Sequence, residues 1–146
     1  MSLLNGKVIK HSALKSSYWR VGVKTTVWAA DTNGAKDLMT WEQTCDKGYG
    51  APIHWHPVEE HLTFYSGQAE VYLDCDTYRI DEPTTVVIPP RIKHGFKNIS
   101  SNPLHVIITM ADSVFESFYD HEPEVVWRAF EGDDGSSKRA VKLGKY

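Results

Sequence analysis

The sequence predicts an all-β fold, either a sandwich or a barrel of antiparallel strands. Short apolar or alternating segments recur along most of the chain, and turn residues such as those at positions 31–34 and 66–67 separate them. Helical periodicity is almost absent before Ala111. The chain has 146 residues, of which 41% are hydrophobic and 24% are charged. This length and composition are sufficient for one globular domain with a buried core.

The predicted strands follow one another at short intervals. They are residues 8–11, 18–30, 38–45, 53–56, 61–66, 68–74, 77–80, 84–88 and 104–110. Because successive side chains on a strand point to opposite faces, the more apolar alternate set is expected to face the core. The inward sets are Met39, Trp41, Gln43 and Cys45; Ala69, Val71, Leu73 and Cys75; and Leu104, Val106, Ile108 and Met110, with His105 pointing outward. Cys45 and Cys75 are both expected to be buried structural thiols.

The pattern changes after Ala111. Residues 113–120 predict a short helix that packs Phe115 and Phe118 on the barrel, and residues 131–146 are rich in glycine, serine and charge. We therefore expect a barrel with its N-terminal strands at residues 1–112, a C-terminal cap segment at 113–130 and a flexible tail at 131–146.

Composition excludes several classes of function. The formal net charge of −3 gives no electrostatic basis for binding nucleic acid or an anionic membrane. No apolar run approaches the roughly 20 residues that a membrane span needs. The first ten residues lack the apolar segment of a secretory signal, and two cysteines do not make a disulfide framework. A cytoplasmic protein is expected.

Residues 48–60 carry the most informative pattern. His54 and His56 are two positions apart on a predicted strand, so both imidazoles face the same side. Pro57 ends that strand, and a short turn can bring Glu60 back towards the two histidines. His94 follows a proline-rich turn after another apolar strand and is well placed to complete the group.

Three imidazoles and one carboxylate form a mixed nitrogen and oxygen site. Such a site suits one divalent transition-metal ion, which could be Fe, Mn, Ni, Cu, Co or Zn. An isolated pair of histidines two residues apart more often forms ordinary hydrogen bonds. The four matched ligand types therefore favour a metal site over that interpretation.

These residues resemble the two motifs of the cupin superfamily. The first motif is matched at every spacing by Gly48, His54, His56, Glu60 and Gly67. The second motif is matched by Pro89, His94 and Asn98, whereas Pro83 and Arg91 replace its two glycines. The resemblance covers residues 48–98 and implies a small single-domain, metal-binding member of the superfamily. It further implies a cupin double-stranded β-helix, a jelly-roll-like barrel, with His54, His56, Glu60 and His94 as metal ligands and a homodimeric assembly.

Parity also predicts which side chains surround the ion. The candidate substrate pocket is Met39, Trp41, Gln43, Leu62, Phe64 and Phe96, although core packing alone explains the apolar members equally well. A buried Gln43 needs a hydrogen-bond partner, so it could orient a ligand histidine or contact substrate. Gln43, Tyr49 and His61 are the candidates for acid–base catalysis. Glu59 and His61 flank Glu60 and are expected to point away from the ion.

Two functions are consistent with these features. The favoured one is a metal-dependent enzyme of the oxygenase, isomerase, lyase or cyclase type that acts on a small organic substrate. The alternative is a non-catalytic protein that binds or senses a small molecule, which the lack of an attached output domain disfavours. A purely structural ion is disfavoured because structural sites are usually closed and rich in cysteine.

Overall fold

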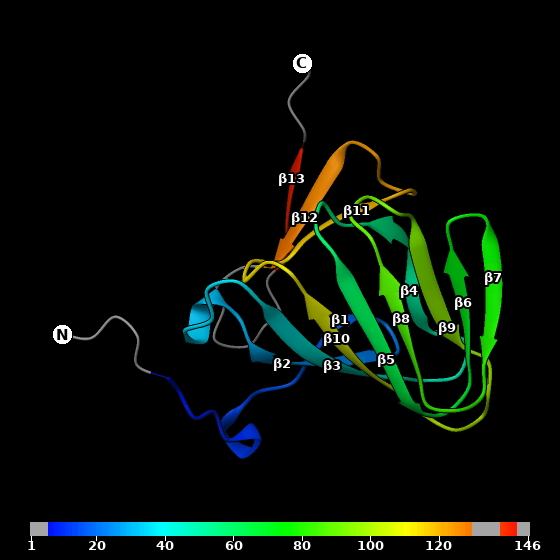
Figure 1. Ribbon diagram of the computed structural model, residues 1–146, viewed down its shortest axis with the longest axis horizontal. Helices are drawn as coiled ribbons and strands as arrows, with labels where there is room; N and C mark the ends of the chain where they lie inside the picture. Colours follow the sequence, from blue (N-terminus) through cyan, green and yellow to red (C-terminus); the bar gives the residue numbers. More distant parts are fainter. Residues whose placement is uncertain (1–5, 130–137, 143–146) are drawn as a thin grey trace.

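Two antiparallel β-sheets pack against each other in the computed structural model, which describes residues 6–129 and 138–142 (Figure 1). One sheet has the strand order β1-β2-β3-β10-β5-β8, and the other has the order β13-β12-β11-β4-β9-β6-β7. Consecutive strands often belong to different sheets, so the chain crosses repeatedly between the two layers. The predicted all-β, jelly-roll-like barrel is confirmed.

The strands are short and evenly distributed. The first sheet contains β1 (Ser17–Arg20), β2 (Val23–Ala29), β3 (Met39–Cys45), β10 (Leu104–Met110), β5 (Glu60–Ser66) and β8 (Thr84–Ile88). The second contains β13 (Lys138–Lys142), β12 (Val125–Ala129), β11 (Glu116–Tyr119), β4 (Gly50–Trp55), β9 (His94–Asn98), β6 (Ala69–Leu73) and β7 (Asp76–Ile80). The described helices are two 3₁₀ turns, η1 (His11–Ala13) and η2 (Asp31–Asn33), so no helix in this part of the chain could cross a membrane.

The centre of the first sheet follows the predicted alternation. On β3 and β10 every second residue is buried, in the two sets predicted above. The two strands are paired in register, with Val106 opposite Gln43 and Ile108 opposite Trp41. Trp41 also meets Trp19 and Phe115, with ring centroids 6.1 and 5.8 Å away. This aromatic cluster fills the space between the sheets with large apolar groups.

Three predicted elements near the N-terminus and the middle of the chain differ from the structure. Residues 8–11 do not form a strand, because this part of the chain is mostly exposed and leads into η1. The predicted strand 18–30 is divided by a turn at Val21 and Gly22. Strand β9 was not predicted, because glycine, lysine and asparagine make up much of it. Gly95 belongs there because a Cβ atom at that position would lie 2.8 Å from the carbonyl oxygen of Ala51.

The predicted helix at residues 113–120 is wrong, because the segment forms β11. There Ser117 and Tyr119 are buried while Glu116 and Phe118 are less so, which is the alternation of a strand between β4 and β12. Phe115 does pack on the barrel, as predicted.

Strand β12 was not predicted either. Of the predicted flexible tail, residues 131–137 and 143–146 lie outside the described residues, and Lys138–Lys142 pair with β12 as strand β13.

The two cysteines have different environments. Cys45 is fully buried, as predicted. The prediction of a buried Cys75 is wrong, because the residue lies in the exposed turn between β6 and β7. The prediction assumed that the strand's alternation of inward and outward side chains continues to position 75, but β6 ends at Leu73.

Candidate metal centre

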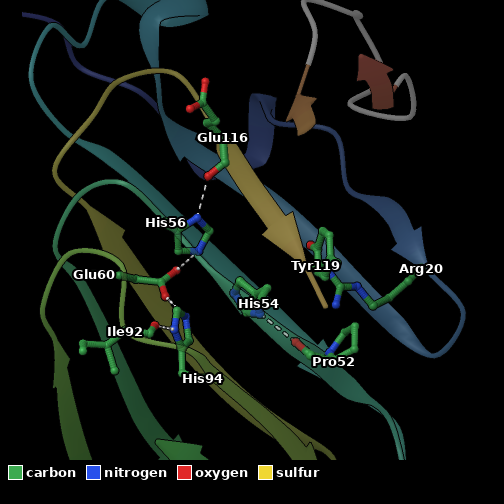
Figure 2. A network of polar contacts seen from close by, with 9 residues as sticks. All are labelled: Arg20, Pro52, His54, His56, Glu60, Ile92, His94, Glu116 and Tyr119. Carbon is green, nitrogen blue, oxygen red and sulfur yellow. Dashed lines mark hydrogen bonds and ion pairs between the residues drawn. The ribbon is translucent and has the colours of Figure 1, made fainter. Parts of the chain in front are cut away.

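The four predicted ligands come together inside the barrel (Figure 2). Their ligand atoms all lie within 4.8 Å of one another, and the most exposed of the four side chains, His54, is only 5% exposed. The histidines come from the second sheet: His54 on β4, His56 just beyond it and His94 at the start of β9. Glu60 begins β5 in the first sheet. The cluster therefore spans the gap between the two sheets.

A β-bulge in β4 aims the histidine pair inward. Ala51 is paired with Phe96 and His54 with His94. Between these two pairs β4 advances by three residues and β9 by only two. Pro52 and Ile53 therefore lie opposite the single residue Gly95, and Pro52, which has no N–H group, is tolerated at such a bulge. Ala51 and His54 therefore both face the interior, although their odd spacing would place them on opposite faces of a regular strand.

Each histidine is held through its Nδ1 atom by a backbone carbonyl group. The Nδ1 of His54 lies 2.7 Å from the carbonyl oxygen of Pro52, that of His56 lies 2.6 Å from Glu116, and that of His94 lies 2.9 Å from Ile92. A carbonyl oxygen only accepts hydrogen bonds, so Nδ1 must carry the proton in all three rings. In the neutral form of each ring, Nε2 carries a lone pair that points into the cluster, as in histidines that bind metal ions.

These lone pairs face the carboxylate of Glu60. Oε2 of Glu60 is 2.6 Å from Nε2 of His94, and Oε1 is 3.2 Å from Nε2 of His56. The buried Nε2 of His56 has no hydrogen-bond partner among the described residues. Atoms that both carry lone pairs repel at such distances unless a proton or a metal cation lies between them. The residues therefore fit a bound cation.

Burial and neighbouring charges shift the pKa values of the cluster. Burial raises the pKa of the Glu60 carboxyl, but the His56 and His94 rings outweigh this effect and hold it well below its ordinary value. Burial, with positive charge on His94 and His56, lowers the pKa of His54 well below its ordinary value. Burial also lowers the pKa of His56, but the Glu60 carboxylate and the carbonyl of Glu116 raise it overall. These directions leave Glu60 ionised and His54 neutral, the states in which both bind metal.

In the turn before His94, Arg91 stands where the cupin motif has a glycine, and its backbone is strained. Arg91 has a φ of +68°, in the left-handed region where glycine is favoured. Its backbone N–H donates to the carbonyl of His56 over 2.8 Å, which ties this turn to the histidine strand. The Arg91 side chain is exposed and is not among the residues that line the cavity beside the cluster. Gly48 and Gly67, the two glycines of the first motif, also have positive φ angles, of 83° and 89°.

A small cavity adjoins the ligand cluster, and we call it the inner cavity. It has a volume of about 20 Å³, which is room for roughly one water molecule. It is lined by Trp19, Arg20, Trp41, Gln43, Ala51, His54, His56, Glu60, Leu62, Phe96, Ile108, Phe115 and Tyr119. The predicted pocket residues Trp41, Gln43, Leu62 and Phe96 are among them. Met39 and Phe64 are buried in the core but do not line this cavity.

The predicted acid–base candidates lie in three different places. Gln43 faces the inner cavity, and its amide donates to the hydroxyl of Thr25 over 3.1 Å rather than to a ligand histidine. Tyr49 is 44% exposed and does not line the cavity. His61 lies on the outer face of β5, where its Nε2 donates to Glu59 over 2.6 Å, so both residues point away from the cluster as expected.

Five residues of the cavity wall were neither predicted ligands nor predicted inward-facing positions: Trp19, Arg20, Ala51, Phe115 and Tyr119. Tyr119 belongs to the strand that was interpreted as a helix. Trp19 and Arg20 are consecutive in β1, and alternation would allow only one of them to face inward. No local signal in the sequence identifies these positions, because the bulge in β4 and the tertiary packing of β1 and β11 place them beside the cluster.

A second, larger cavity lies outside the first, and we call it the vestibule. It has a volume of about 210 Å³ and is lined by Trp19, Arg20, Pro52, Tyr119, His121, Glu122 and Trp127. Trp19, Arg20 and Tyr119 line both cavities and form the boundary between them. A larger groove, of about 500 Å³, includes none of the four ligands, but it shares Arg20, Ala51 and Phe96 with the inner cavity.

Comparison with known proteins agrees with this architecture. Residues 41–110 match the family model of the cupin domain. A 60-residue segment is 35% identical to auxin-binding protein T92 of Nicotiana tabacum, covering 40% of this chain and 32% of that protein. The chain thus matches about a third of the length of this curated relative.

Solved structures share the fold at low sequence identity. The oxalate decarboxylase of Lactobacillus farciminis aligns with a TM-score of 0.67 and 20% identity, over 76% of this chain and 35% of that chain. An oxalate decarboxylase of Bacillus subtilis aligns with a TM-score of 0.63 and 22% identity, over 70% and 29% of the two chains. KdgF from Halomonas sp. aligns with a TM-score of 0.61 and 18% identity, over 72% of this chain and 94% of that chain.

Proposed function

Because the chain belongs to the cupin superfamily, we propose that it is a metal-dependent enzyme that acts on a small organic substrate. One divalent transition-metal ion is held by His54, His56, Glu60 and His94. The substrate reaches the ion from the vestibule, since the inner cavity itself has room for little more than a water molecule.

One observation carries this proposal. Four ligand atoms from both sheets converge within 4.8 Å, and each of the three imidazoles is oriented by a backbone carbonyl so that Nε2 faces the cluster. Hydrogen-bonded, buried histidines with no metal role do not need this shared orientation. Metal ligands do, because the second nitrogen fixes the direction of the first.

The chain's own residues prepare the site for chemistry. If the ion is six-coordinate, three neutral imidazoles and one carboxylate would leave two positions open, and the ion would there polarise a carbonyl or enol oxygen or bind dioxygen. Trp41, Leu62 and Phe96 exclude bulk water from the inner cavity, which strengthens electrostatic interactions there. This chemistry is of the oxygenase, isomerase, lyase or cyclase type, and dioxygenase activity is the first to be tested.

The metal content of the native protein is the decisive measurement. Because one structural neighbour is described as having Mn(II) centres, manganese is measured together with iron, cobalt, nickel, copper and zinc. We expect about one ion per chain, and a marked loss of metal in Glu60→Ala. Glu59→Ala is the matched control, because Glu59 is exposed and points away from the cluster. Full occupancy in Glu60→Ala would contradict the ligand assignment.

Activity is tested with the metal-loaded protein and a panel of catechols, flavonols and diketones. Oxygen consumption that depends on both the metal and one of these substrates would identify an oxygenase. Substrate conversion without oxygen uptake would identify the isomerase, lyase or cyclase branch. Loss of conversion in Glu60→Ala, but not in Glu59→Ala, links the activity to the ion.

The alternative is a protein that binds or senses a small molecule without converting it. The positions of the acid–base candidates favour this alternative, because Tyr49 and His61 do not line the inner cavity and Gln43 is hydrogen-bonded to Thr25. A small molecule that co-purifies with the protein and is recovered unchanged after incubation with metal and oxygen would support it. It would also contradict the proposed enzymatic function.

A homodimeric assembly and a cytoplasmic location remain predictions. Barrels of this kind present edge strands and sheet faces that can pair with a second copy. Light scattering coupled to size-exclusion chromatography measures the assembly directly, and a mass of one chain would contradict the dimer.

A further inference from the structure

Resting on the function proposed above, we propose that the substrate is a small organic anion whose carboxylate is bound by Arg20. The binding place is the boundary between the inner cavity and the vestibule. The apolar body of the anion occupies the vestibule, and Arg20 determines specificity without being a metal ligand.

Arg20 lies where a substrate would pass from the vestibule to the ligand cluster. Together with Trp19 and Tyr119 it lines both cavities. The ring of Tyr119 lies 5.3 Å from that of His54, measured between centroids. Figure 2 shows the Arg20 guanidinium against Tyr119, on the side of His54 that faces away from Glu60. A group bound by Arg20 is therefore held close to the ligand cluster.

A second β-bulge brings Arg20 to this position. Tyr18 is paired with Lys24 and Arg20 with Val23. Between these two pairs β1 advances by two residues and β2 by one, so Trp19 is the extra residue. The bulge allows the consecutive side chains of Trp19 and Arg20 both to reach the cavities. Bulges that redirect a side chain are common beside functional sites.

No carboxylate among the described residues neutralises the charge of Arg20. Its Nη2 donates to the hydroxyl of Tyr119 over 2.8 Å and its Nη1 to the carbonyl of Gly50 over 3.4 Å, and both acceptors are uncharged. No ion pair joins Arg20 to an acidic residue in the part of the chain that the structure describes, whereas Arg128 pairs with Glu116. A half-buried guanidinium has five donors arranged to bind a carboxylate with two hydrogen bonds.

The ligand cluster adds to the preference for an anion. A divalent ion bound by one carboxylate and three neutral imidazoles keeps a net positive charge. Together with Arg20, it places two positive groups at the inner end of the vestibule, and the carboxylate of Glu122, which accepts from Trp127, belongs to the vestibule wall. A negatively charged substrate is therefore favoured over its neutral analogue at this place.

The vestibule suits a compact ring or short apolar body. Trp19, Tyr119 and Trp127 supply large aromatic surfaces in a volume of about 210 Å³. Trp127 is held in place because its Nε1 donates to Glu122 over 2.5 Å. The chemistry that fits is a monocarboxylate joined to a planar or apolar group.

Benzoate and benzamide are the probes that test this proposal, because they share a shape and differ in charge. Each is titrated into the metal-loaded protein while tryptophan fluorescence is recorded, since Trp19 and Trp127 line the vestibule. We expect benzoate to bind saturably and about tenfold more tightly than benzamide, the difference that a charge-assisted hydrogen bond can give. Arg20→Gln should abolish this preference, while Arg79→Gln, which removes an exposed arginine on β7, should keep it.

Arg20→Lys is the second variant, and it keeps the proposal testable if Arg20→Gln does not fold. Lysine retains the charge but not the paired donors, so the preference for benzoate should be reduced and still present. Equal affinity of the native protein for the two probes, or an unchanged preference in Arg20→Gln, would overturn the proposal. Metal content is measured on every sample. A native protein without metal contradicts the proposed function, and the same titration then still tests Arg20, which is not a ligand.

Discussion

Glu60 on β5 and His94 on β9 face each other across the barrel, with Oε2 and Nε2 2.6 Å apart. Nδ1 of His94 donates to the carbonyl of Ile92, so Nε2 faces Glu60 and joins the two sheets through a hydrogen bond in the metal-free protein. A bound metal ion would replace the shared proton and be held by both atoms. Metal loading should therefore affect the stability of the whole barrel as well as its chemistry.

Metal binding is expected to stabilise the fold. A ligand that binds only the folded state at about 100 times its dissociation constant adds about 2.7 kcal/mol to the free energy of unfolding. The midpoint of thermal unfolding should fall when a chelator removes the ion and recover when the ion returns. His94→Ala should lose this response and His61→Ala should keep it, because His61 lies on the outer face of β5. An equal response in the two variants would contradict the ligand assignment.

The metal-free protein is expected to lose the stabilising contribution of Glu60 in acid. Its folded-state pKa is lowered, because the His56 and His94 rings outweigh the effect of burial. An ionised Glu60 therefore contributes stability above its ordinary pKa of 4.5, and this contribution is lost as the pH falls below that value. Denaturant unfolding of the metal-free native protein and Glu60→Gln should show a difference that shrinks from about pH 6 to about pH 3. A difference that grows in acid would contradict the direction of the shift.

Replacing Arg91 by glycine is expected to stabilise the protein. Arg91 has a φ of +68°, and a side chain costs about 1–2 kcal/mol in that region. The greater freedom of glycine in the unfolded chain offsets part of this gain, so we expect a net increase of about 0.5–1 kcal/mol. Chemical denaturation of Arg91→Gly measures the change. Lys93→Gly is the control, since it removes a nearby exposed cation at a position without a positive φ, and it should not stabilise.

The two cysteines should differ strongly in reactivity. Burial, only partly opposed by Arg20, raises the pKa of the Cys45 thiol to about 12. Cys75 is exposed in a turn. Because the thiolate is the reactive form, a thiol reagent at about pH 8 should modify one thiol per folded chain. In Cys75→Ser no thiol should react until the protein unfolds. A reaction of the folded Cys75→Ser variant would mean that the barrel opens at β3.

The sequence by itself was sufficient to predict the class of fold and the ligand cluster. Alternation is strong in β3 and β10, because both strands bury one complete face, and their inward residues were predicted correctly. The metal-ligand candidates were identifiable because the chemistry demands particular residue types at particular spacings. His54, His56 and Glu60 lie within seven consecutive residues, so local geometry brings them close before any packing is considered.

Only the tertiary structure decided what surrounds that cluster. Strand β11 was interpreted as a helix because a short apolar segment has no decisive periodicity, and its pairing with β4 and β12 determines its conformation. Trp19 and Arg20 face the cavities together because a bulge in β1 interrupts the alternation on which sequence analysis depends. A bulge is a property of how two strands pair, and neither strand carries it alone. The four residues that converge in the candidate metal site could therefore be predicted from the sequence, whereas the positions of Trp19, Arg20 and Tyr119 beside it depend on the folded barrel.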